Sequence, residues 1–379
     1  MTDFFGGKSE KKVEYIELIY DLIFVYLIGR NNSLLHNIEN GFFSVNAFFT
    51  YLISTLVILQ VWYLSTLFIN RYGKKSAADY IGLFINMYLL YYLGEGTRAD
   101  WSLYYIPYNV AWGIILLNIA FQYWRVMHSS KSGAMWAKQH LKHHMIFLII
   151  EAAIVFAAIP VYMLTHLPLS WLSLVFGFVS AIFMSRVDLL IPVNAEHLTE
   201  RIMLFVVFTF GEMIVSLAVY FANGFSLNTV YFSVMAFLIV AGLFLIYGYF
   251  YDNIIDRERE NMESGYMVLH IFLILALNNI TVALEFMREA EVGMIAKNIF
   301  IVASFLLYYL FLIIIGHYSR EDCGITRGFI VKLVCITVLF VALMALCYQN
   351  SWLSIAVSAM YIYSMFGAVA LSPKREKNK

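Results

Sequence analysis

The chain has 379 residues, of which 62% are hydrophobic and 13% are charged, and its mean hydropathy is +0.76. A water-soluble protein carries roughly a quarter of its residues as charges, and a single hydrophobic core stops growing near about 250–300 residues. The 25 basic and 25 acidic residues balance and form neither a basic stripe nor an acidic tail, so that no nucleic-acid partner is predicted. Composition therefore predicts an all-α, polytopic membrane protein whose main partner is the lipid bilayer.

Runs of about 20 apolar residues, the length of helix that crosses a hydrocarbon layer of about 30 Å, occur about twelve times. Glycine and glutamate interrupt the outer end of the third run, at Gly94, Glu95 and Gly96. In chain order the predicted transmembrane helices cover residues 15–36, 43–69, 78–95, 103–124, 143–164, 168–187, 197–221, 228–250, 266–287, 295–316, 327–348 and 351–371.

Lysine and arginine gather in alternate connections between these helices. Most of them lie in the N-terminal tail, in the connections after even-numbered helices and in the C-terminal tail. The odd-numbered connections hold only Arg30, Arg98, Arg288 and Lys297. Cytoplasmic loops of membrane proteins carry this excess of basic residues. The pattern therefore predicts a multi-pass protein of the plasma membrane with both termini in the cytoplasm.

The twelve predicted helices divide into two sets of six. Six helices per half give both halves the same orientation, so that a duplication would be parallel. The first and seventh helices are weakly alike, since each has a glutamate near the inner surface, then Leu, Phe and Val, and then a glycine followed by a charge. We therefore predict a cytoplasmic N-terminal tail, two six-helix halves and a cytoplasmic C-terminal tail, at residues 1–12, 13–190, 191–372 and 373–379.

Several charged side chains lie inside the apolar helices, where a charge at the bilayer centre costs about 2.5–3.5 kcal/mol. Glu17 and Asp21 are four residues apart and share one helical face. Like charges at this spacing repel each other, so we expect a basic partner or a bound proton. Glu200 and Arg201 start the seventh helix, and Glu212 lies about 16 Å beyond Arg201 on the same face.

Two interpretations of these residues remain open. In the first, Glu200 and Arg201 belong to an interhelical salt bridge that locks the two halves together. In the second, Asp21 and Glu212 alternate between protonated and ionised forms along an ion path, with Arg201 holding the ionised state. Glu151, deep in the fifth helix, is a further candidate for the path.

The first and seventh helices also carry two motifs. One reads Glu-Leu-x-x-Asp-Leu-x-Phe-Val and is formed by Glu17, Leu18, Asp21, Leu22, Phe24 and Val25. The other reads His-x-x-Glu-Arg, Leu-Phe and Gly-Glu, and is formed by His197, Glu200, Arg201, Leu204, Phe205, Gly211 and Glu212. Together they resemble the motifs of the bacterial low temperature requirement protein A family, although Met213 stands where serine commonly follows Gly-Glu. The resemblance implies a bacterial plasma-membrane protein and adds His197, Gly211 and Phe24 as supporting residues.

Three functions follow from these observations. The leading one is a secondary transporter or ion-translocating protein that moves a small solute or ion by means of its intramembrane carboxylates; the chain has no GxxxxGK[ST] segment for a built-in ATPase. The second is a non-catalytic membrane stress or scaffold factor. The third is a metal-dependent intramembrane enzyme, for which His140 and His144 are weak ligand candidates at four-residue spacing. No catalytic residue and no cofactor is predicted.

Overall fold

A computed structural model describes residues 11–95, 101–129, 135–188, 191–222, 224–257, 259, 264–320 and 327–371. The predicted C-terminal tail, 373–379, and most of the N-terminal tail lie outside these residues. In the described ranges the chain forms long helices at each predicted apolar run: α1 (Tyr15–Asn31), α2 (Val45–Tyr72), α3 (Ala77–Glu95), α4 (Trp101–Ser129), α5 (Met135–Thr165), α6 (Trp171–Asp188), α7 (Ala195–Ser216), α8 (Leu227–Tyr249), α9 (Ser264–Phe286), α10 (Met294–Ile315), α11 (Arg327–Cys347) and α12 (Ser351–Ala370).

Among the described residues, nine helices are long and apolar enough to cross a membrane: α2, α4, α5 and α7 to α12. Many of their large apolar side chains are exposed at the surface. A water-soluble protein rarely exposes apolar side chains over so large an area, so that these faces need lipid around them. The chain is therefore an integral membrane protein. A count of twelve spans and the orientation of the termini stay predictions.

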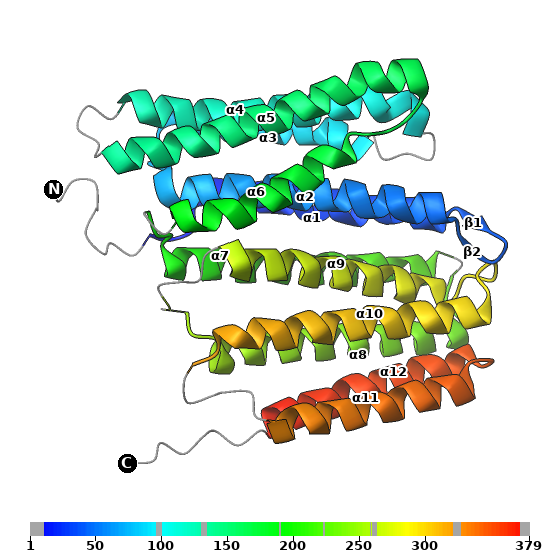
Figure 1. Ribbon diagram of the computed structural model, residues 1–379. Helices are drawn as coiled ribbons and strands as arrows, with labels where there is room; N and C mark the ends of the chain where they lie inside the picture. The colour runs from blue at the N-terminus through cyan, green and yellow to red at the C-terminus, as the bar shows by residue number, and fades with distance from the viewer. Residues whose placement is uncertain are drawn as a thin grey trace, which may run out of the picture. The chain divides into compact units, whose positions relative to one another are not determined.

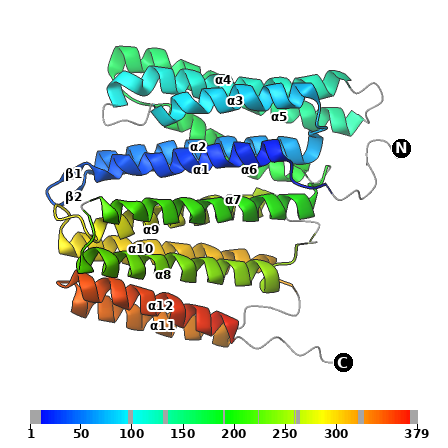
Figure 2. The ribbon, with the colours of Figure 1, turned by 180° about the vertical axis from the view of Figure 1, so that it is seen from behind.

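Two compact units can be distinguished by their internal packing. The first comprises Met1–Asn37, Val45–Phe205 and Glu258–Val268, and the second comprises Ile38–Ser44, Val206–Arg257 and Leu269–Lys379. In the first unit α3, α4 and α5 lie together beside α1 and α2, and α6 crosses α2 (Figures 1 and 2). The second unit contains α8, α10, α11 and α12 with most of α9. The predicted duplication of two six-helix halves stays a prediction.

The first helix ends earlier than its apolar run predicts. Residues 32–36 form a 3-10 turn, Asn32–His36, in place of a last α-helical turn. The segment that ends α1 reads Gly29-Arg30-Asn31-Asn32, and glycine and asparagine are poor helix formers. Asn31 then turns inward, where its Nδ2 donates to the hydroxyls of Ser54 and Thr55 at 3.2 Å each. The outer end of α1 is thus held to α2 by polar contacts.

A short hairpin that the apolar pattern does not predict follows α1. Strands β1 (Ile38–Glu39) and β2 (Phe42–Phe43) pair antiparallel around Asn40 and Gly41, whose φ angles are 54° and 85°. Asn-Gly is the preferred pair for this type of turn. The hairpin belongs to the second unit, because Gly293 N donates to Gly41 O at 2.7 Å.

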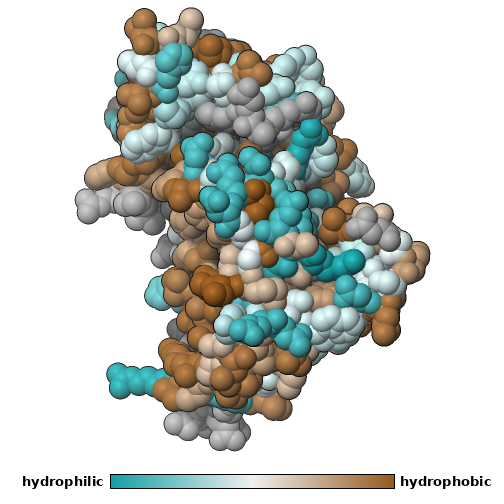
Figure 3. Space-filling view, turned by 90° about the vertical axis from the view of Figure 1, so that its right-hand side faces the viewer, coloured by the Kyte–Doolittle hydropathy of each residue, from teal (hydrophilic) through white to brown (hydrophobic). Residues whose placement is uncertain are grey.

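Aromatic pairs hold the last helices of the second unit together. Phe340 of α11 stacks on Tyr361 of α12 with centroids 4.0 Å apart, and Trp352 of α12 stacks on Tyr231 of α8 at 4.3 Å. Aromatic pairs of this kind add about 0.5–1.5 kcal/mol beyond the area that they bury. Figure 3 shows the side of β1 and β2, where hydrophilic and hydrophobic side chains both lie at the surface.

The predicted orientation can be tested by cysteine labelling in a cysteine-free background. Glu39→Cys lies in a predicted outer connection and Lys74→Cys in a predicted inner one, and both positions are exposed. A membrane-impermeant maleimide added to intact cells should label Glu39→Cys only, and should label both after permeabilisation. The reverse pattern would show that the termini lie outside the cytoplasm.

Candidate functional site

A buried ion pair joins three helices of the first unit: α1, α2 and the first part of α7. Arg201 Nε donates to Asp21 Oδ2 at 3.1 Å, and Arg201 Nη2 donates to Asp21 Oδ1 at 2.8 Å. Trp62 of α2 donates from Nε1 to Asp21 Oδ1 at 2.8 Å. Arg201 and Asp21 are both fully shielded from solvent. A two-point contact between guanidinium and carboxylate is strong and directional, so this pair fixes α7 against α1.

Glu17, one helical turn before Asp21, extends the pair into a network. Its Oε2 lies 3.0 Å from Arg201 Nη1 and 3.3 Å from His197 Nε2. Both Glu17 and His197 are buried. Arg201 thus contacts both carboxylates and supplies the positive charge that faces them. Glu17 therefore extends the ion pair of Asp21 and Arg201 towards His197.

Two asparagines set the position of His197. Asn70 Nδ2 lies 3.0 Å from His197 Nδ1 and donates to Asn194 O at 3.0 Å. Asn194 N donates back to Asn70 Oδ1 at 2.8 Å. Asn194 Oδ1 accepts from His197 N at 3.0 Å and so caps the start of α7. Since Nδ1 of His197 faces a donor, its Nε2 is left to carry the hydrogen directed at Glu17.

Aromatic rings cover this network. Trp62 stacks on Phe205 with centroids 4.3 Å apart and an interplanar angle of 17°. Tyr20 and Phe24 of α1 pack edge to face at 4.8 Å. All four rings are buried. They keep the local dielectric low, which strengthens the ion pair and makes an unpaired charge there costly.

The sequence prediction named most of the residues of this network. Glu17, Asp21, His197 and Arg201 lie together in the structure, and Phe24 packs on Tyr20. Arg201 is the basic partner predicted for the acidic pair on α1. The charged groups of this network are buried and paired with one another. This geometry favours a structural salt bridge over an open ion path.

The segment before α1 closes the network on its predicted cytoplasmic side. Lys11 Nζ donates to the carbonyl oxygens of Ile69 and Asn70 at 2.5 and 2.9 Å. These carbonyls lie in the last turn of α2, where the helix dipole attracts a cation. Lys11 and Glu17 line a cavity of about 30 Å³, the size of about one water molecule. Burial lowers the pKa of Lys11 to about 8, although the charge of Glu17 opposes this shift.

Glu151 is a second buried carboxyl of the first unit, and its surroundings differ. It is 2% exposed, and its Oε1 has no hydrogen-bond partner. None of the ion pairs found among the described residues includes it. A buried carboxylate without a cation is costly, so the neutral, protonated side chain is the form that this environment favours.

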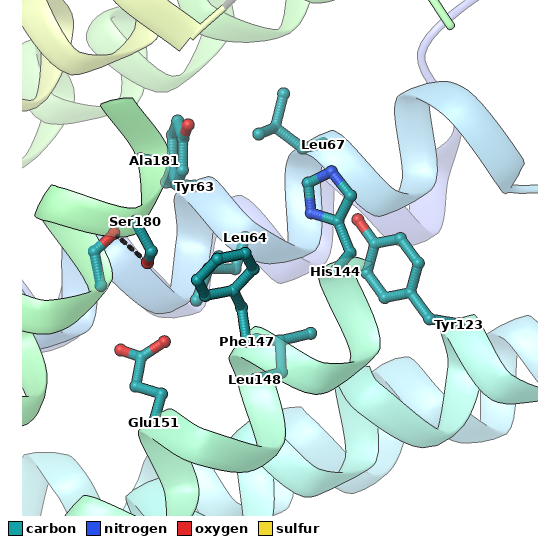
Figure 4. Close-up of a pocket in the computed structure, with 11 residues that line it drawn as sticks. Tyr63, Leu64, Leu67, Tyr123, His144, Phe147, Leu148, Glu151, Ser180 and Ala181 are labelled. Atoms are coloured by element: carbon teal, nitrogen blue, oxygen red, sulfur yellow. Dashed lines mark hydrogen bonds between the residues drawn. The ribbon is translucent and has the colours of Figure 1, made fainter. Parts of the chain in front are cut away.

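A small cavity lies beside Glu151, between α2, α4, α5 and α6 (Figure 4). Its volume is about 30 Å³, enough for about one water molecule. Glu151 and His144 lie two turns apart on α5 and both line it, with Phe147 and Leu148 between them in Figure 4. The ring of Tyr123 stacks on His144, with centroids 5.2 Å apart.

Gly177 of α6 makes room for the Glu151 carboxyl. A Cβ atom at this position would lie 2.6 Å from Glu151 Oε1 and would overlap Gln60 Nε2. Gln60 of α2 is buried and its amide thus lies beside the carboxyl. Ser173 of α6 donates to the backbone oxygen of Glu151 at 2.9 Å, which draws α6 close to α5. Glycine is required here by the close approach of the two polar side chains.

The remaining predicted site residues lie elsewhere. Glu200 is partly exposed at the start of α7 and takes no part in the ion pairs of Arg201. Glu212 and Gly211 belong to the second unit, where Glu212 is partly exposed. A Cβ at Gly211 would meet no atom within 4 Å. The predicted convergence of Asp21 and Glu212 on one space stays a hypothesis.

The two histidines considered as metal ligands have aromatic neighbours. The rings of His140 and His144 are 4.5 Å apart, and His140 Nδ1 lies 2.7 Å from the hydroxyl of Tyr72. In the part of the chain that the structure describes, no group of three or more His, Cys, Asp or Glu side chains is arranged to bind a metal ion.

Several residues of both clusters were not predicted from the sequence. Trp62, Gln60 and Gly177 lie within predicted helices and Asn70 directly after one, and none of the four was named as a candidate. A usable signal did exist, because Gln60 and Asn70 are polar side chains inside the apolar α2, and polar groups within membrane spans generally have a partner or a function. Nothing in the sequence distinguishes Gly177 or Trp62 from their neighbours.

The chain is similar to a known protein family over most of its length. A family model described as "Bacterial low temperature requirement A protein (LtrA)" matches residues 12–363. This range covers more than nine tenths of the chain and includes both the Arg201 network and Glu151. No curated protein matches the sequence.

Loss of Arg201 should destabilise the protein more than loss of the charge on Asp21. Arg201→Met leaves Glu17 and Asp21 buried without their cation, which should cost about 3–5 kcal/mol. Asp21→Asn leaves Glu17 paired with Arg201 and keeps an acceptor for Trp62, and so should cost about 1–3 kcal/mol. Thermal unfolding in detergent measures both variants. Equal losses would show that the charge balance of the network is unimportant.

The pKa of Lys11 predicts a pH dependence of stability. Native Lys11 loses its proton near pH 8 and an unfolded lysine near pH 10.5, so the unfolded state binds more protons between these values. Stability should therefore rise as pH increases from about 8 to about 10, and Lys11→Met should remove this rise. Lys74→Met, at an exposed position, is the control. Parallel pH profiles for wild type and Lys11→Met would contradict the assignment.

Proposed function

The chain belongs to the bacterial low temperature requirement A family, and we propose that it is a proton-linked transporter or ion-translocating protein of the bacterial plasma membrane. Glu151 is the group that binds and releases the proton. The ion pair between Asp21 and Arg201 holds α1 and α7 in place while this happens. Glu17 and His197 complete that fixed network. In this assignment Glu151 exchanges a proton, whereas Glu17 and Asp21 belong to a fixed ion network.

The depth and isolation of Glu151 support the proposal. It lies about 24 Å from the first residue of α5 and about 21 Å from the last, at 1.5 Å per residue. A carboxyl near the middle of a membrane-spanning helix is costly to keep unless it has a function. Asp21 is compensated by Arg201 and Trp62, whereas Glu151 has the neutral Gln60 beside it. Glu151 is therefore the carboxyl whose charge can change without breaking an ion pair.

The cavity beside Glu151 supports a proton as the transferred species. Its volume of about 30 Å³ admits about one water molecule and no larger solute. His144 lines the same cavity, and imidazole accepts and donates protons near neutral pH. A water molecule between them would connect the carboxyl of Glu151 to the imidazole of His144. Chains of Glu, His and water are typical proton relays within membrane proteins.

A second candidate function is a membrane scaffold factor without transport. The specific observation in its favour is the mutual pairing of Glu17, Asp21, His197 and Arg201. If Glu151 likewise only fills space, its protonated form would serve as a hydrogen-bonding partner of Gln60. The two functions differ in one property, because transport requires that Glu151 exchange its proton during activity.

Glu151→Gln tests the proposal, because it keeps the shape of the side chain and removes its exchangeable proton. Purified protein is placed in vesicles that contain a pH-sensitive dye, and a pH gradient is imposed across the membrane. Wild type should carry a proton flux above that of protein-free vesicles, and Glu151→Gln should reduce it to that background. Thermal stability should change little, since burial already favours the neutral side chain.

Glu196→Gln is the matched control, since Glu196 is an exposed carboxyl in the first turn of α7. Its proton flux should equal that of wild type. The proposal fails if wild-type vesicles show no flux above background, or if Glu151→Gln conducts as well as wild type. Infrared difference spectra add an independent readout, since a protonated-carboxyl band that changes with pH should be absent from Glu151→Gln.

A further inference from the structure

A hollow of the second unit lies between α10 and α11, far from Glu151 in the sequence. Its volume is about 470 Å³, roughly fifteen times the volume of a water molecule. Apolar side chains line most of it, including Ile299, Ala303, Leu306 and Val341. Ile299 is 63% exposed, so the hollow is a groove on the membrane-facing side of the helices. Water does not fill an apolar space of this kind.

The groove has the length of one lipid leaflet. It extends along α10 from Ile295 to Leu306, a distance of about 16–17 Å at 1.5 Å per residue. Half of a hydrocarbon layer about 30 Å thick is about 15 Å. At the level of Leu306 the two helices are joined by the buried rings of Phe305 and Phe340, whose centroids are 6.0 Å apart. One acyl chain therefore fits from the helix end down to this aromatic contact.

Polar atoms occur at the opposite end, near the start of α10. Asn298 and Tyr348 line the groove there. Asn298 Nδ2 donates to the backbone oxygens of Met294 and Tyr348 at 2.8 and 3.1 Å. Its Oδ1 is buried and has no hydrogen-bond partner, and the whole residue is only 6% exposed. A buried acceptor of this kind needs a donor, and its position at the polar end of an apolar groove indicates an amphiphile.

We propose that this groove binds one acyl chain of a phospholipid whose headgroup carries a hydrogen-bond donor. The chain lies along Ile299, Ala303 and Leu306, and the headgroup hydroxyl or ammonium donates to Asn298 Oδ1. Lipids with ethanolamine or glycerol headgroups have such donors, whereas choline has none. The site is independent of Glu151 and does not depend on the proposed proton transport.

The test uses the full-length protein in nanodiscs that contain a phosphatidylethanolamine with a photoreactive group at the end of one acyl chain. After illumination, mass spectrometry of peptides should locate the label within 299–306 and 341–348. Ala303→Trp fills the groove and should lower this labelling at least tenfold. Val338→Trp is the matched control, because Val338 lies on α11 outside the groove and is 63% exposed. It should leave labelling at the groove unchanged.

Asn298→Leu separates the headgroup contact from the acyl-chain contact. Native mass spectrometry should show wild type retaining phosphatidylethanolamine about 2–10-fold better than phosphatidylcholine of the same chains, the ratio expected for one hydrogen bond. Asn298→Leu should remove this preference and keep the labelling by the acyl chain. Labelling spread evenly over the exposed faces of α10 and α11, or unchanged by Ala303→Trp, would overturn the proposal. Crosslinks between two protein chains at Ala303 would assign the groove to a second copy instead, and would also overturn it.

Discussion

A buried charge in a membrane must have a partner, and the contact of Asp21 with Arg201 meets this requirement for the first unit. Each of these side chains would be costly alone, and together they form a two-point ion pair without solvent. The pair constrains its neighbours as well. Trp62 is oriented by its bond to Asp21 and then stacks on Phe205, so that α1, α2 and α7 share one rigid contact.

Glu151 is also buried in the membrane, but it has no charged partner among the residues that the structure describes. Instead of a cation it has the neutral amide of Gln60, the space left by Gly177 and a cavity of about one water molecule. Two acidic groups of one unit are thus placed in environments that favour different protonation states, the arrangement by which proteins separate a fixed charge from an exchangeable proton. The proposed proton transfer depends on this contrast between Asp21 and Glu151.

The groove between α10 and α11 extends this reasoning to the lipid-facing surface. If that surface had apolar side chains alone, lipid would bind all parts of it equally well, because hydrocarbon tails are as apolar as leucine. Asn298 breaks this equivalence at one end, and the contact of Phe305 with Phe340 closes the other. The groove therefore has one polar end and one closed end. Its direction and its length both match a single acyl chain that enters from one membrane surface.

The sequence by itself determined the membrane class, the positions of the helices and the main members of the ion network, because lipid requires long apolar helices and makes charged residues within them rare. Glu17, Asp21 and Arg201 were recognisable on that ground, whereas His197 was named only through the family resemblance. Tertiary structure decided what each of them contacts, and that Glu151 has Gln60 and Gly177 as neighbours in place of a cation. It also decided that the hairpin of Ile38–Phe43 belongs to the second unit. Apolar periodicity does not predict such pairings. Partners such as Asp21 and Arg201 are 180 residues apart and meet only through the packing of whole helices.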